Sequence, residues 1–162
     1  MALSGSLDIP KDEAQALYDL YFETYRGVKK YVKTQKRYAH QHGYVQTVLG
    51  RKRHLENYIW SKNFGDVGYA ERLSVNAPVQ GSAADIAISA QLIVENDPEL
   101  KALGFEQLLQ IHDEIVGQCP EENAERVKER LAEIMADCLP RKLNGVELEA
   151  SVDHGFTYAQ AK

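Results

Sequence analysis

The order of apolar and polar residues predicts two helices in the first part of the chain. Over residues 10–25, Ala14, Leu17 and Tyr21 recur at the spacing of one helix face. A strongly basic helix follows, and Gly43 suits its C-terminal end. Glycine is favoured there because it readily adopts the left-handed backbone conformation that ends many helices.

Two more helices are predicted further along the chain. The segment from about residue 61 to residue 96 has a helical pattern in its later part, and Pro78 lies inside it. Because proline lacks a backbone donor and kinks a helix, this segment is either one kinked helix or two stacked pieces. An amphipathic helix is then expected over residues 120–140. Its apolar stripe consists of Ala124, Val127, Leu131, Ile134, Met135 and Cys138.

Alternation with a period of two predicts strands in three places. Residues 44–55 form a small hairpin with a basic turn, and residues 105–118 form a second hairpin with its turn at His112–Glu114. Residues 146–155 form a last strand. Its apolar face consists of Val146, Leu148, Ala150 and Val152. These elements predict an α+β fold, in which a small antiparallel sheet is covered by several helices on one face.

Charge is unevenly distributed over the chain. The formal net charge of −5 excludes a protein that is basic overall, yet the segment from Arg26 to Arg53 contains no acidic residue. Such a segment suits a bound polyanion, although it can equally be a solvated helix face. Cys119 and Cys138 lie far apart and lack zinc-site spacing, as expected of reduced thiols in the cytoplasm. No stretch is apolar enough to predict a membrane span.

The acidic pair Asp113–Glu114 interrupts the second hairpin between two apolar strands. A carboxylate in a tight turn can simply accept hydrogen bonds from its own backbone. Alternatively, two strands hold the pair in place as ligands for a hard cation, because Mg²⁺ takes one or two carboxylates together with substrate phosphates. Two such ions stabilise the attacking and leaving oxygens of a phosphoryl displacement.

Two groups of donor side chains suggest contact with nucleic acid. Arg72, Asn76 and Gln80 are four residues apart, so a continuous helix places them on one face. These donor-rich side chains suit the acceptor atoms of a minor groove, although the face can also be only solvated. The run Arg51–Arg53 is predicted at the tip of the first hairpin, where it suits phosphates, but basic turns are common.

Taken together, these pieces resemble the C-terminal part of the family A DNA polymerases, the bacterial DNA polymerase I class. The strings "YVQTVLGRKRHL", "AERLSVNAPVQGSAADI" and "QIHDEIV" occur in the order and at the spacing of that family. The match covers nearly the whole chain. The departures are Ile111 and Ile115, where valine and leucine are usual, Ser82, where threonine is usual, and a tail that follows the family only loosely.

The resemblance implies a fragment with fingers-like helices and a basic hairpin over residues 1–60, and a palm-like long helix, catalytic hairpin, helix and strand over residues 61–162. It implies that Asp113 is a catalytic Mg²⁺ ligand and that Glu114 is a supporting carboxylate and second metal ligand. His112 would lie by the primer terminus. The remaining implied roles are minor-groove contacts of primer–template DNA by Arg72, Asn76 and Gln80, and DNA contacts by Arg51, Lys52 and Arg53.

Two other motifs of that family, similar to "DYSQIELR" and "RRxxKxxxFGxxYG", do not occur in this sequence. We therefore expect the C-terminal part of a split or truncated DNA-directed DNA polymerase, of bacterial or phage origin and cytoplasmic. It would act in replication or repair on primer–template DNA and deoxynucleoside triphosphates. A partner chain would complete its two-Mg²⁺ site. The alternatives are a non-catalytic module that binds duplex DNA, and a fragment that folds without activity.

Overall fold

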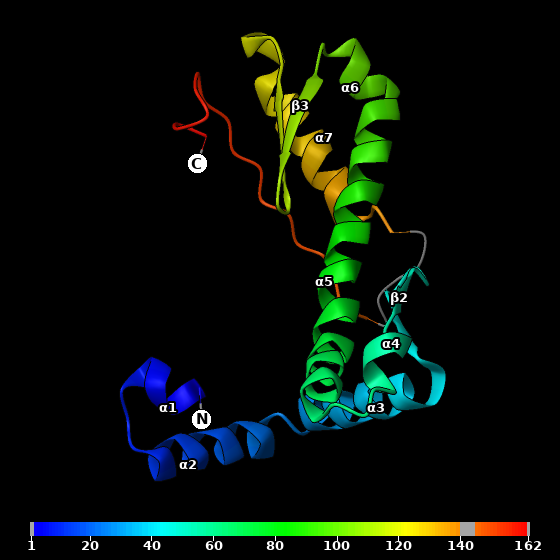
Figure 1. Cartoon of the computed structure of the whole chain (residues 1–162). Helices are drawn as coiled ribbons and strands as arrows, with labels where there is room; N and C mark the ends of the chain where they lie inside the picture. The colour runs from blue at the N-terminus through cyan, green and yellow to red at the C-terminus, as the bar shows by residue number, and fades with distance from the viewer. Residues whose placement is uncertain (1, 140–144, 162) are drawn as a thin grey trace. The chain divides into compact units, whose positions relative to one another are not determined.

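The computed structural model describes residues 2–139 and 145–161 and divides the chain into two compact units, Met1–Val79 and Gln80–Lys162 (Figure 1). The first unit contains α1 (Ala2–Leu7), α2 (Lys11–Thr24), α3 (Arg26–His42), β1 (Tyr44–Gln46), β2 (Lys52–His54) and α4 (Glu56–Ile59). The second contains α6 (Pro98–Ala102), β3 (Glu106–Ile111), β4 (Glu114–Gln118), the 3₁₀ turn η1 (Glu121–Asn123) and α7 (Ala124–Ala136). Helix α5 (Phe64–Asn96) contributes to both.

Helix α5 is one continuous helix of 33 residues with Pro78 inside it. The structure therefore decides between the two predicted alternatives in favour of a single helix. Ala70, Ser74 and Pro78 are its buried positions in the first unit and recur every fourth residue. A helix places such residues on one side, so this stripe anchors the first part of α5 against its unit.

The core of the first unit gathers around the end of α3. Its buried residues are Ala39, Val45, Leu55, Ile59 and Ala70. Gly43 ends α3 with φ 76°, as the sequence predicts, and its carbonyl accepts a hydrogen bond from the Leu55 amide at 2.7 Å. A side chain at this glycine would collide with Trp60 and Glu56. Both the backbone angle and the close approach of α4 therefore require glycine.

The core of the second unit lies between α7, the end of α5 and the β3–β4 hairpin, which Figure 1 shows beside α7. Its buried residues are Val94, Leu100, Val127, Leu131 and Ile134. The predicted stripe of α7 is thus confirmed as core. Asp97 caps α6 by accepting a hydrogen bond from the Leu100 amide at 2.9 Å, and Arg130 on α7 donates to the same carboxylate at 2.8 Å.

The sheet differs from the predicted one in two respects, although the α+β class is confirmed. The strands pair as two separate antiparallel hairpins, β1–β2 and β3–β4. The predicted last strand is wrong: Val146 makes an isolated bridge, and residues 147–155 have no regular structure. Leu148, Ala150 and Val152 are nonetheless half-buried, whereas the residues between them are exposed. The alternation therefore reports an extended segment that packs one side on the core without a ladder of strand hydrogen bonds.

Among the helices within the described ranges 2–139 and 145–161, none combines the length and the apolar character needed to cross a bilayer.

Candidate metal and nucleic-acid binding site

The β3–β4 hairpin ends in a two-residue turn formed by His112 and Asp113. The sequence predicted a turn over His112–Glu114, but Ile111 pairs with Glu114, so Glu114 is the first residue of β4 and lies outside the turn. His112 has φ 56°. A positive φ at the first turn position is what the tightest hairpin turns require, because it matches the twist of the two strands. The short turn therefore places Asp113 at the tip and Glu114 beside it.

Local contacts fix the two strands that carry this turn. Gly117 lies under the ring of Phe105, where any side chain would collide with it. Gln118 donates a hydrogen bond to Glu106 across the strands at 2.9 Å, and Gln110 donates to the carbonyl of His112 at 3.0 Å. One hydrogen bond therefore fixes the strands at the end far from the turn, and the other fixes the residues next to it.

Asp113 and Glu114 are both exposed. One oxygen of Glu114 accepts a hydrogen bond from the hydroxyl of Tyr158 at 3.1 Å. Sequence reasoning missed Tyr158, because the tail has no periodicity and lies 44 residues away along the chain. This contact orients Glu114 and leaves Asp113 at the tip to meet a ligand.

The turn can supply part of a metal site. Across the part of the chain that the structure describes, no group of three or more His, Cys, Asp or Glu side chains gathers so as to hold a metal ion. Mg²⁺ needs only one or two protein carboxylates when phosphate oxygens and water complete its shell. Two adjacent, exposed carboxylates fit that requirement, and further ligands would have to come from outside this turn.

The three donors predicted on α5 are all exposed. Arg72 and Asn76 belong to the first unit and Gln80 to the second, and each lies half a turn away from the buried positions Ser74 and Pro78. Because α5 is continuous, a spacing of four residues gives the donors one helix face. Their approach to the Asp113 turn remains a prediction.

Beside these donors, α5 is tied to the basic helix α3. Glu71 pairs with Lys36 at 2.9 Å and with His40 at 3.1 Å, and the hydroxyl of Tyr31 donates to the carbonyl of Val75 at 3.0 Å. Hydrogen bonds from Lys36 and then His40 lower the pKa of Glu71. Part of the basic charge of α3 is therefore used inside the protein, a pairing that the separation along the chain hid from sequence reasoning.

The basic hairpin differs in detail from the prediction. Only Arg51 lies in the loop, whereas Lys52 and Arg53 belong to β2, opposite Gln46 and Val45. The loop is longer than predicted because Gly50, with φ 88°, closes a turn by donating to Thr47. All three basic residues are exposed. The Lys52 ammonium lies 4.3 Å from the ring centroid of Tyr44, which orients that side chain.

Comparison with known proteins gives consistent matches over this chain. The model of DNA polymerase family A matches residues 1–160. The DNA polymerase I of Streptococcus pneumoniae strain TIGR4 is 39% identical over 162 residues, covering 99% of this chain and 18% of that protein. The chloroplastic and mitochondrial DNA polymerase I B of Arabidopsis thaliana is 36% identical over 156 residues, covering 94% of this chain and 14% of that protein.

A solved structure agrees with these relatives. The POL domain of Pol1 from M. smegmatis, in complex with DNA primer-template and dNTP, has a TM-score of 0.90 and 34% identity, and the match covers 98% of this chain and 27% of that domain. The chain thus spans only 14% to 18% of the length of the two curated relatives.

Proposed function

Since this chain belongs to DNA polymerase family A, we propose that it supplies the C-terminal part of the active site of a DNA-directed DNA polymerase. The observation that carries this proposal is the β3–β4 turn. It holds Asp113 and Glu114, both exposed, at the end of a tight hairpin inside a chain that matches the family over its length. The reaction is template-directed nucleotidyl transfer in replication or repair.

In this proposal the turn contributes carboxylates to a Mg²⁺ site. Asp113 binds the ion, and Glu114, oriented by Tyr158, supports it as a second carboxylate. His112, held in a left-handed conformation, lies by the primer terminus. Bound Mg²⁺ would offset the charge that develops on the transferred phosphoryl group. The protein's part is to keep the two carboxylates at a fixed position while primer and nucleotide come and go.

DNA contacts are proposed for the two groups of donors. Arg72, Asn76 and Gln80 would donate to minor-groove acceptors, which recur on every base pair and therefore test duplex shape more than sequence. Arg51, Lys52 and Arg53 would bind phosphates. The solved relative contains primer-template DNA and dNTP, which supports both as partners of this chain.

The chain supplies only part of such a polymerase. We propose that residues 1–60 are fingers-like, that residues 61–162 are palm-like, and that the other catalytic carboxylate and the triphosphate site come from polymerase residues outside the given sequence. Exposed apolar side chains support this incompleteness, since Leu108 and Leu109 on β3 are 53% and 58% exposed and Phe64 is 93% exposed. Apolar surface of this kind marks a contact with a partner chain or with further parts of the protein. The proposed location is the cytoplasm of a bacterial or phage-infected cell.

A second candidate is a non-catalytic module that binds duplex DNA. It is favoured by the exposed donors on α5 and by the basic residues of β2, none of which needs a metal to bind DNA. In that case Asp113 would be no more than a turn residue.

Primer extension distinguishes the two candidates. We expect this chain alone, with primer–template, Mg²⁺ and all four nucleotides, to extend nothing, because one carboxylate turn cannot position two metals or offset the triphosphate charge. Adding a separately produced segment that carries the remaining family A motifs should restore Mg²⁺-dependent extension. Extension by the chain alone would contradict the proposed incompleteness. DNA binding without restored extension would favour the non-catalytic module.

A further inference from the structure

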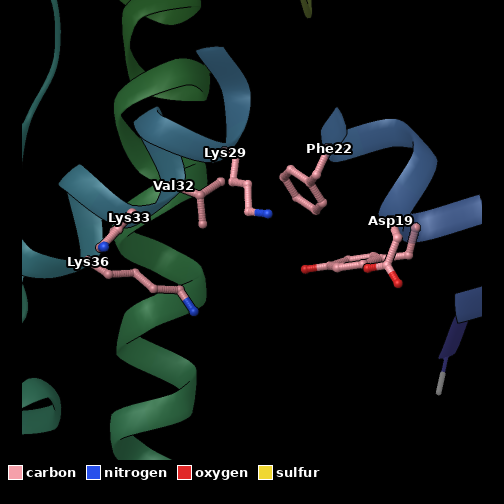
Figure 2. Close-up of a pocket in the computed structure, with 7 residues that line it drawn as sticks. Asp19, Phe22, Lys29, Val32, Lys33 and Lys36 are labelled. Carbon is pink, nitrogen blue, oxygen red and sulfur yellow. The ribbon is translucent and has the colours of Figure 1, made fainter. Parts of the chain in front are cut away.

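A pocket of about 300 Å³ lies between α2 and α3 of the first unit, apart from every residue placed above in the polymerase site. Its lining comes from Tyr18, Asp19 and Phe22 on α2, and from Lys29, Val32, Lys33 and Lys36 on α3. Figure 2 shows Lys29 extending from α3 towards the ring of Phe22. The face that α3 turns to its neighbouring helix is therefore rich in lysine, where a packed helix pair would normally be apolar.

Two of these three lysines are available to a ligand. Lys36 already pairs with Glu71 at 2.9 Å. Lys29 and Lys33 are exposed, and no ion pair to either is found within residues 2–139 and 145–161. They lie one helical turn apart on α3, a helix without any acidic residue. Two ammonium groups at this spacing present a local positive charge to an anion.

The opposite wall of the pocket is aromatic. The rings of Tyr18 and Phe22 lie edge to face with centroids 4.7 Å apart, and Tyr18 is 47% exposed. Asp19 stands beside them and accepts a hydrogen bond from the amide of Gln15 at 3.0 Å. Its carboxylate disfavours a phosphate on the α2 side but can accept a hydrogen bond from an exocyclic amino group of a base.

We propose that this pocket binds one nucleotide of single-stranded DNA, with its phosphate at Lys29 and Lys33 and its base against Tyr18 and Phe22. Positive charge along one side and an exposed aromatic face on the other are the combination that holds single strands. Duplex DNA should bind this pocket poorly, because its bases are already stacked on one another and cannot stack on Tyr18 and Phe22. The site does not depend on the polymerase role proposed above.

The first experiment measures fluorescence anisotropy of a labelled oligo-deoxycytidine strand with the full chain at neutral pH and several salt concentrations. The variant Lys29→Ala/Lys33→Ala should bind more weakly, and the slope of log affinity against log salt should become shallower by about 0.7, because one phosphate contact is lost. The matched control is Lys30→Ala/Lys62→Ala, which removes the same charge from two exposed lysines outside the pocket lining. It should change the affinity by less than half as much.

The second experiment tests the aromatic wall. Tyr18→Ala should weaken oligo-deoxycytidine binding by about tenfold, because one stacked base is lost. An abasic strand of the same length has phosphates but no bases, so its affinity should not change with Tyr18→Ala and should still fall with Lys29→Ala/Lys33→Ala. Circular dichroism of each variant checks that α2 and α3 remain folded.

Several outcomes would contradict the proposal that this pocket binds a single-stranded nucleotide. Equal losses in the pocket variant and its control would mean diffuse attraction to basic surface. Equal losses for duplex and single strand would mean that no base is held. No measurable single-strand binding would have the same consequence. Should Tyr18→Ala or the lysine pair unfold the helices, Lys29→Gln in the otherwise native chain must still weaken binding and make the salt slope shallower. These results leave the primer-extension test untouched, so the two proposals fail separately.

Discussion

The hairpins β1–β2 and β3–β4 are both two-stranded and antiparallel. They differ in the length of the turn, in the sign of the charge near it, and in how far their apolar side chains are buried. The first has a loop closed by Gly50 and carries Arg51, Lys52 and Arg53, whereas the second has a two-residue turn with Asp113. Val45 and the adjoining Leu55 are buried in the first unit. In the second hairpin, Leu108 and Leu109 remain more than half exposed.

The two hairpins differ in how much of their apolar surface is covered within their own unit. A two-stranded hairpin is stable in water only when its apolar face is packed against something else. The first hairpin receives that packing from α3, α4 and α5 of its own unit. The second packs Ile115 and Phe105 against α7 and leaves β3 leucines uncovered. The acidic turn therefore lies on the hairpin whose apolar side chains are the less covered within this chain.

The largest effect is expected from truncating a leucine of each hairpin region. Leu55→Ala should lower the free energy of unfolding by about 2–5 kcal/mol, because it opens a cavity in a buried core. Leu109→Ala should change it by no more than about 0.5 kcal/mol, because that side chain already faces solvent. Urea denaturation of both variants measures the contrast, and similar losses would show that β3 is covered within this chain.

A smaller effect is expected from Asp97, which anchors the helices under the second hairpin. Hydrogen bonds from Arg130 lower the pKa of this carboxyl group, and burial opposes them only partly. The charged form is therefore favoured in the folded state. Its contribution to stability is present above the unfolded pKa of about 4 and is lost as the pH falls through the depressed folded value.

Two variants resolve this contribution. Asp97→Asn keeps a capping side chain but loses the charge, whereas Asp97→Ala loses both and should cost about 1–2 kcal/mol at neutral pH. Thermal unfolding between pH 2 and 7 should show a smaller acid-dependent loss in Asp97→Asn than in the native chain. An unchanged pH profile would mean that Arg130 does not act on Asp97.

The smallest effect is expected at Gln80 on the donor face of α5. Gln80→Ala should weaken binding of several duplex sequences about equally, by about 1 kcal/mol, because one hydrogen bond to a recurring acceptor is lost. The control Gln41→Ala, also exposed on a helix, should have no such effect. Titration of labelled duplexes measures both, and a strong dependence on sequence would contradict recognition of shape.

Much of this structure follows from local patterns in the sequence. The α7 stripe, Gly43 at the end of α3 and the hairpin around Asp113 are all set by periodicity and backbone freedom, which neighbouring residues carry. The final strand was predicted wrongly because alternation reports one-sided burial, as at Leu148 and Val152, and not the presence of a pairing strand. Pairing depends on a neighbouring strand that can be distant in the sequence, and no local pattern encodes its position.

The site was predictable only where its residues are neighbours in the chain. Asp113 and Glu114 stand together, and Arg72, Asn76 and Gln80 share a helix period. By contrast, the hydrogen bond of Tyr158 to Glu114 and the ion pair of Lys36 with Glu71 join residues far apart. The pocket between α2 and α3 likewise requires two helices to meet at a corner, so neither helix reveals it alone.

The central claim is that Asp113 binds the catalytic metal of a polymerase. Its most direct test is Asp113→Asn in this chain, mixed with the segment that carries the remaining family A motifs, and assayed for Mg²⁺-dependent primer extension. We expect extension to fall by at least about a thousandfold, since a charged ligand worth several kcal/mol is lost, while association of the two chains is unchanged. The matched control Asp137→Asn, another exposed aspartate, should extend normally. Retained extension by Asp113→Asn, or loss of association, would make Asp113 a structural turn residue and contradict the assignment.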